Sequence, residues 1–131
     1  MVDVLAYHLS SIMNSELRGE REVVLLPASK LSASVLRVLQ KEGYIGEFEY
    51  VDDGRFGKFK VQLLGRINKI GPVRPRVSIK YNELLRLPEN LRRFLASRDL
   101  GHLILSTNQG VMTHKDALVK KTGGVIIAYV Y

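Results

Sequence analysis

The sequence of 131 residues contains no cysteine. This absence excludes a disulfide framework and a thiolate metal site. No apolar run approaches the roughly 20 residues that a membrane-spanning helix needs. The first residues, Met1 to Val4, also lack the basic and apolar stretches of a signal peptide. We therefore expect a soluble protein of the cytoplasm.

Acidic residues are scarce in the second half of the chain. The whole chain has a formal net charge of +7 and a pI near 9.8. Residues 1–71 hold ten Lys and Arg against nine Asp and Glu, whereas residues 72–131 hold ten against four. Such a balance indicates a polyanionic partner, usually nucleic acid and less often an anionic membrane. The attraction would come mainly from residues 72–131.

The first 71 residues show helical and strand patterns in turn. Asp3 can cap a first helix, whose apolar residues recur at helical spacing and which Gly19 ends. Ser29 can cap a second helix, which Gly43 ends. Apolar or alternating patterns predict three strands, over residues 22–26, 46–51 and 58–63. We therefore predict an N-terminal α/β subdomain with the order α-β-α-β-β.

Residues 65–76 interrupt this pattern with two glycines, two prolines, four basic residues and no acidic residue. Such a composition predicts a junction between two subdomains. The junction could be a solvated linker or a basic strap that lies along phosphates.

The remaining residues predict strands and small helices. Strands are expected over residues 77–81, 102–107 and 125–131, the last one buried because it is continuously apolar. The patterns together predict an α+β fold of two small α/β subdomains, residues 1–71 and residues 72–131. The second subdomain is expected to be mostly β with short helices.

Three helix starts are predicted in this second half. Asn82 can cap a short helical turn, and Pro88 suits the first turn of another helix. Thr113 and Asp116 resemble a capping box for a third helix, which would end at Gly123-Gly124.

Ser106, His114 and Asp116 are close enough in sequence to suggest a catalytic triad. No G-x-S-x-G nucleophile elbow is present, and Asp116 already has a role at a helix start. The three histidines lack ligand spacing, and the glycine pairs match neither a phosphate loop nor a dinucleotide fingerprint. We therefore predict no enzyme activity, no metal site and no cofactor.

Small polar residues precede a glycine in Ser106-Thr107-Asn108-Gln109-Gly110. Their hydroxyls and amides can bond phosphate, ribose 2′-OH groups or base edges, and Gly110 removes a side chain where a ribose could press. The N-terminus of the helix expected next would add free amide groups, and three lysines lie on or near it. From the residues alone, an RNA-binding loop and an ordinary strand-to-helix turn both remain open.

The chain resembles small-subunit ribosomal protein eight. The second half carries Ile104-Leu105-Ser106-Thr107-Asn108-Gln109-Gly110-Val111-Met112-Thr113, followed by Gly123-Gly124 and Ala128-Tyr129-Val130. The first half is similar to archaeal-type members in Pro27-Ala28-Ser29-Lys30 and in Gly65-Arg66-Ile67-Asn68-Lys69. The resemblance implies a two-domain α/β protein that binds the central domain of 16S rRNA directly and helps organise the subunit platform. Its partners would be that rRNA and neighbouring small-subunit ribosomal proteins, around a monomer within the ribosome.

The resemblance and the basic residues give one set of expected RNA-binding positions. In the C-terminal domain they are Lys80, Ser106, Thr107, Asn108, Gln109, Gly110, Thr113, Lys115, Gly123 and Gly124. In the N-terminal domain and the junction they are Asn14, Ser29, Lys30, Arg66, Lys69, Arg74 and Arg76. Two positions depart from the family pattern, since Asn108 replaces a usual serine and Val125 a frequent acidic residue.

We expect the protein to read the shallow minor groove and distorted shape of an RNA helix. Hydroxyls and amides would give direction, and basic side chains would give attraction. Two alternatives are a small hydrolase that uses Ser106 and His114, and an interaction module whose basic face binds an acidic protein.

Overall fold

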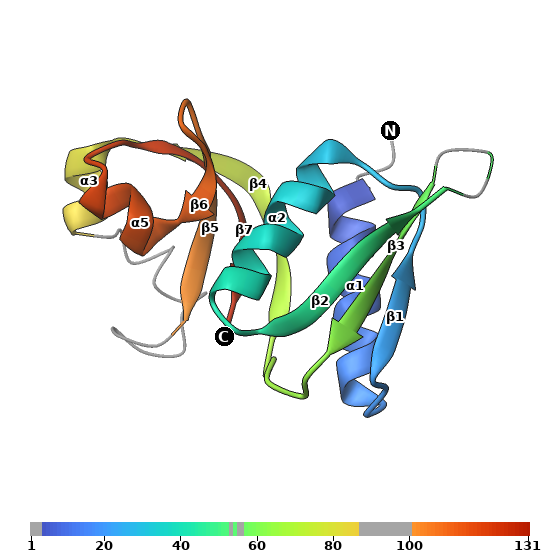
Figure 1. Ribbon diagram of the computed structural model, residues 1–131. Coiled ribbons are helices and arrows are strands. Elements are labelled where there is room, and N and C mark those ends of the chain that lie inside the picture. The colour runs from blue at the N-terminus through green and yellow to red at the C-terminus, as the bar shows by residue number, and fades with distance from the viewer. Residues whose placement is uncertain (1–3, 53, 55–56, 87–100) are drawn as a thin grey trace. The chain divides into compact units, whose positions relative to one another are not determined.

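The computed structural model describes residues 4–52, 54, 57–86 and 101–131 (Figure 1). The chain divides into two compact units, one ending at Ile70 and the other beginning at Gly71. We call them unit 1 and unit 2, and we describe each by itself. No helix in these described ranges is both long and apolar enough to cross a membrane.

Unit 1 is a three-stranded antiparallel sheet with two helices on one of its faces (Figure 1). Its elements are α1 (Val4–Leu17), β1 (Glu22–Leu25), α2 (Lys30–Lys41), β2 (Ile45–Val51) and β3 (Lys58–Leu63). The strand order is β1-β3-β2, and β3 is antiparallel to both neighbours. The predicted α-β-α-β-β order is confirmed, while the cap predicted at Asp3 lies outside the described residues.

The core of unit 1 lies between the helices and the inner face of the sheet. Phe59, Val61 and Leu63 of β3 are buried, whereas Lys60 and Gln62 between them are exposed. Because side chains alternate along a strand, this pattern buries only one face. The helices supply the facing apolar side chains, which include Leu5, Leu9, Ile12, Val35 and Leu39.

His8 of α1 is a polar residue buried in this core. Its Nε2 lies 3.2 Å from the carbonyl oxygen of Leu26, and its Nδ1 lies 2.7 Å from the hydroxyl of Ser32. A carbonyl can only accept, so Nε2 carries the proton and Nδ1 accepts from Ser32 in the neutral ring. Burial lowers the pKa of His8, which favours that neutral form. His8 thereby links α1 to α2 and to the end of β1.

Unit 2 is built on a four-stranded sheet with the order β4-β7-β5-β6. Its elements are β4 (Ile70–Ile79), α3 (Tyr81–Leu85), β5 (His102–Thr107), β6 (Gly110–Thr113), α5 (His114–Val119) and β7 (Gly124–Val130). β7 is an inner strand with Ile126, Ile127 and Ala128 buried, as expected of a continuously apolar run. The helix predicted from Pro88 lies outside the described residues.

Two details around β4 differ from the sequence patterns. The boundary between the two units falls inside the segment predicted as a junction, but much of that segment is part of the strand, which covers residues 70–79. β4 is an edge of the sheet, a position at which a strand tolerates a proline whose nitrogen faces away from its neighbour. Tyr81, predicted as strand, begins α3 instead. The helix is capped at Lys80 rather than Asn82, and the Lys80 N–H donates to the Glu83 carboxylate over 3.1 Å.

The segment after β5 also differs from its prediction. β6 stands between the polar turn and the helix, where a direct turn into the helix was expected. Its four residues, Gly-Val-Met-Thr, do not alternate between apolar and polar and so give no strand signal in the sequence. The helix itself ends at Val119, several residues before the predicted end at Gly123.

Replacing His8 by alanine tests the link between α1, α2 and β1. We expect His8→Ala to lower the free energy of unfolding by about 1–3 kcal/mol, because two buried polar groups lose their partner. Urea unfolding followed by circular dichroism measures this change. Ser10→Ala, at an exposed position on the same helix, is the control and should change stability by less than about 0.5 kcal/mol. Equal effects of the two variants would contradict the role given to His8.

Candidate nucleic-acid interface

The polar stretch from Ser106 to Gly110 forms the tip of a β-hairpin. Thr107 and Gly110 are the last paired residues of β5 and β6, and Asn108 and Gln109 make the turn between them. The Thr107 hydroxyl donates to the Gly110 carbonyl over 2.8 Å and accepts the Gln109 N–H over 3.1 Å. Gly110 has a φ of +115°, a conformation that favours glycine. The tip is therefore a rigid turn that exposes Asn108 and Gln109.

Gly123 and Gly124 allow three strands to approach closely beside this hairpin. A Cβ on Gly123 would overlap the carbonyl oxygen of Ile79 and lie 2.9 Å from the Cα of Lys80. A Cβ on Gly124 would overlap the carbonyl oxygen of Ser106. The obstacles are backbone atoms, so no change of rotamer could relieve them. The beginning of β7 consequently lies against the ends of both β4 and β5.

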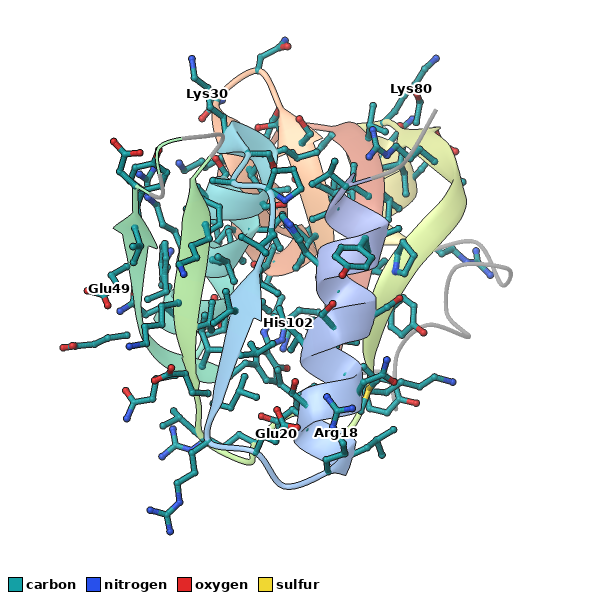
Figure 2. The ribbon with its side chains drawn as sticks, turned by 90° about the vertical axis from the view of Figure 1, so that its right-hand side faces the viewer. Arg18, Glu20, Lys30, Glu49, Lys80 and His102 are labelled. Atoms are coloured by element: carbon teal, nitrogen blue, oxygen red, sulfur yellow. The ribbon has the colours of Figure 1, made fainter. Side chains whose placement is uncertain are left out.

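These contacts gather several expected site residues at one end of the sheet. We call this the hairpin end of unit 2, made of Lys80, residues 106–110 and residues 120–124. Figure 1 shows the β5–β6 turn projecting beyond the sheet, and Figure 2 shows the Lys80 side chain pointing away from the fold. Lys120 and Lys121 are exposed and directly precede the glycine pair in sequence.

The exposed lysines of the hairpin end lack carboxylate partners in the described parts of the chain. Ion pairs of unit 1 join Arg18 to Glu20 at 2.7 Å and Lys60 to Glu22 at 3.7 Å, whereas none is found for Lys80, Lys120 or Lys121 among the described residues. Lys80, Lys120 and Lys121 therefore leave positive charge open to an anionic ligand.

Thr113 and Lys115, both expected to bind RNA, lie away from the hairpin tip. Thr113 is only 1% exposed, and its hydroxyl accepts the Asp116 N–H over 3.2 Å at the start of α5. It lies three residues along β6 from Gly110, a separation of about 10 Å. The helix N-terminus consequently does not flank the turn, and Thr113 has a structural position in the cap.

His114 is a buried residue that extends the pairing of β6 with β5. Its Nδ1 accepts the Leu103 N–H over 3.0 Å, just beyond the last strand pair. Burial lowers its pKa to about 4, with smaller contributions from His102 and Lys115. The three histidines lie on three different elements, although the rings of His102 on β5 and His114 on α5 have centroids 6.3 Å apart.

The residues that suggested a catalytic triad do not form one. Nδ1 of His114 is occupied by a backbone amide, and Ser106 pairs with Val111, three residues before His114. The Asp116 backbone is held by the cap of α5. Triads are defined by a chain of side-chain hydrogen bonds, and no such chain joins these three residues.

The site residues expected in unit 1 are divided between its two ends. Ser29 caps α2 by accepting the Ser32 N–H over 3.1 Å, and Lys30 beside it is exposed. Asn14 lies one helical turn before Arg18, to which its carbonyl is bonded. Figure 2 shows Lys30 and Arg18 at opposite ends of unit 1. The structure therefore does not bring Asn14 together with Ser29 and Lys30.

The basic residues between β3 and the end of β4 differ in their contacts within the protein. Arg66 donates to the carbonyl of Gly43 over 3.2 Å, and Lys69 is exposed nearby in sequence. Arg76 is an exposed residue of β4, whereas the side chain of Arg74 lies outside the described part.

Replacing His114 by asparagine tests whether this buried, neutral ring makes the stability of the protein depend on pH. Its pKa falls from an ordinary 6.5 to about 4 on folding, so the unfolded chain binds the proton first as the pH decreases. This histidine therefore makes the protein less stable as the pH drops from about 6.5 to about 4. His114→Asn keeps an acceptor for the Leu103 N–H but does not titrate.

We expect the variant to lose less stability than the parent between pH 7 and pH 4.5, measured by urea unfolding at each pH. All other titratable groups are the same in both proteins, so their contributions cancel in the comparison. An identical pH dependence of the two proteins would rule out this role for His114.

Comparison with known proteins identifies the family. The sequence matches the family described as ribosomal protein S8 over residues 3–131. A protein of Aeropyrum pernix named small ribosomal subunit protein uS8 is 62% identical over 131 residues, covering 100% of this chain and 98% of its own. Proteins of the same name from Desulfurococcus amylolyticus and Metallosphaera sedula are 57% and 52% identical with the same coverage. The chain therefore belongs to the ribosomal protein S8 family.

Proposed function

We propose that the chain is a structural constituent of the small ribosomal subunit and binds rRNA directly through the hairpin end of unit 2. The names of its relatives and the net charge of +7 support this proposal. Its target would be the central domain of 16S rRNA, where it would help organise the platform beside neighbouring ribosomal proteins in the cytoplasm. Membership of a ribosomal protein family favours a structural role over an enzymatic one.

The composition of the hairpin end is the observation that carries the proposal. It combines exposed amides on a hydrogen-bonded turn, a glycine pair, and exposed lysines for which no ion pair is found among the described residues. The minor groove of RNA is shallow and displays 2′-OH groups and base edges, which a projecting turn can reach. The glycine pair holds Lys80 and the turn at the same end of the sheet, and the lysines compensate the charge of the RNA backbone.

Different residues of this end would have different tasks. Asn108 and Gln109 would donate and accept directional hydrogen bonds, since their side chains are exposed at the turn. Thr107 would act mainly by fixing the turn, because its hydroxyl is already bonded within it. Lys80 and Lys120 would contact phosphates, which gives affinity but little selectivity.

Unit 1 would make additional contacts with RNA phosphates. Lys30 extends from the capped start of α2, while Arg66 and Lys69 follow β3. The Arg66 guanidinium is bonded to the α2–β2 turn, at the end of α2 opposite to Lys30. These residues would therefore contact separate stretches of backbone rather than form one patch.

Chemical footprinting of small-subunit rRNA with and without the protein tests the proposal. We expect protection focused on one helix of the central domain and its adjoining backbone. Protection scattered over the whole rRNA would contradict the proposal. Stronger binding to an acidic protein than to the protected RNA fragment, measured by gel shift, would favour an interaction module instead.

Removing the exposed amide at the turn should reduce selectivity. We expect Asn108→Ala to lower the ratio of affinities for the protected rRNA fragment and a regular duplex by about 3- to 10-fold, the value of roughly one hydrogen bond. Filter binding with both RNAs measures this ratio. Gln40→Ala, which removes an exposed amide from α2 of unit 1, is the matched control. If Asn108→Ala leaves the ratio at the control value, the turn does not read the RNA.

Removing a lysine from the hairpin end should instead reduce the affinity for RNA without changing the selectivity. We expect Lys120→Ala to weaken both RNAs alike and to reduce the slope of log affinity against log salt by about 1. The measurement is filter binding across a series of salt concentrations. A selective loss for the cognate fragment would show that Lys120 contributes more than charge.

A further inference from the structure

The helix α5 ends in an unusual way at Lys121. The Lys121 N–H donates to the Leu118 carbonyl over 3.2 Å, and the Thr122 N–H donates to the Ala117 carbonyl over 3.0 Å. These two bonds define a Schellman motif, in which the residue after the cap adopts a left-handed conformation. Lys121 occupies that position with a φ of +55°.

Glycine is the usual residue at this position because a Cβ is strained there. In the described ranges, every positive φ angle except that of Lys121 belongs to a glycine. A residue larger than glycine makes the unfolded chain stiffer, which by itself favours folding. At positive φ, the strain of that residue in the folded protein exceeds this benefit, so the protein is less stable than with glycine. Lysine at position 121 therefore costs stability.

Glycine would allow the same two hydrogen bonds without the strain, and no ion pair in the described part of unit 2 offsets the cost of the lysine. Lys121 is exposed, and no carboxylate of the described residues lies within ion-pair distance of its ammonium. Lys120 beside it carries the same charge, which adds repulsion. Residues held in unfavourable backbone conformations commonly serve a function.

The surroundings of Lys121 indicate which function. The residue stands two positions before Gly123, whose backbone touches Ile79 and lies close to Lys80. Lys121 is exposed and therefore belongs to the hairpin end, in the segment that leads into the glycine pair. A polyanion that approached the hairpin end would meet the exposed side chains of both Lys80 and Lys121.

We propose that Lys121 is a phosphate-contacting residue of the RNA site, retained in a strained conformation at the expense of folding stability. The proposal rests on the RNA-binding function proposed above. It adds that this one side chain contributes to affinity and weakens the fold, so that a single substitution should move the two properties in opposite directions. Lys115, on the same short helix, is not expected to combine these effects because it has an ordinary helical conformation.

Lys121→Gly is the decisive variant for this inference. Removing the strained Cβ should raise the Tm by about 2–6 °C, measured by differential scanning calorimetry of the full chain. The same variant should bind the protected rRNA fragment about 2- to 10-fold more weakly and lower the salt slope by about 1. Either an unchanged Tm or an unchanged affinity would overturn the inference.

Two matched variants separate charge from backbone strain. Lys121→Arg keeps both the charge and the side chain at positive φ, so it should retain the affinity of the parent without a higher Tm. Lys120→Ala removes an equal charge from a residue in ordinary helical conformation, so it should weaken binding without raising the Tm. A rise in Tm for Lys120→Ala equal to that of Lys121→Gly would overturn the inference, because relief of charge repulsion would then explain both.

The outcome also distinguishes this inference from the proposed function. If the parent protein fails to bind the rRNA fragment, the proposed function fails. If the parent binds but Lys121→Gly binds equally well, only the role of Lys121 fails.

Discussion

The close approach of backbones at Gly123 and Gly124 is the constraint on which unit 2 depends. β7 is an inner strand, and its first residues must pass between the end of β4 and the end of β5. Carbonyl oxygens of Ile79 and Ser106 occupy the space that side chains at the two glycines would need. Backbone obstacles cannot move without breaking strand pairing, so side chains are excluded at these two positions. The same close approach brings Lys80, the β5–β6 turn and the segment before β7 to one end of the sheet, where the candidate site lies.

Strand and helix patterns were predictable where one face of an element is buried. β3 alternates between core and solvent, and β7 is apolar throughout, so both were identified from sequence. β6 was missed because its residues do not alternate between apolar and polar, and β4 was shortened because its prolines suggest a break. The edge position that makes those prolines acceptable is a property of the assembled sheet, which no local pattern reveals.

The residues of the candidate site were predictable by type rather than by arrangement. The exposed amides of the turn followed from a run of small polar residues, and their role in binding remains a proposal. The proximity of Lys80 to Gly123 joins segments more than forty residues apart, so it depends on the strand order. The bond between His8 and Ser32 likewise spans 24 positions and could not be inferred from either helix alone. Conversely, Thr113 was expected to bind RNA because the sequence gives no sign of its burial, which depends on the strands around it.

Rigidity of the hairpin end bears directly on how an RNA could be recognised. Thr107 bonds both sides of the turn, and His114 ties the base of the hairpin to α5. A site ordered before binding loses little conformational entropy on association, so each hydrogen bond that it makes contributes more to affinity. The same rigidity prevents the turn from adapting to a regular duplex, and a mismatch in shape leaves amides unpaired. Selectivity would therefore come from a fixed geometry held by buried contacts, and charge from Lys80, Lys120 and Lys121 would act on any RNA that fits it.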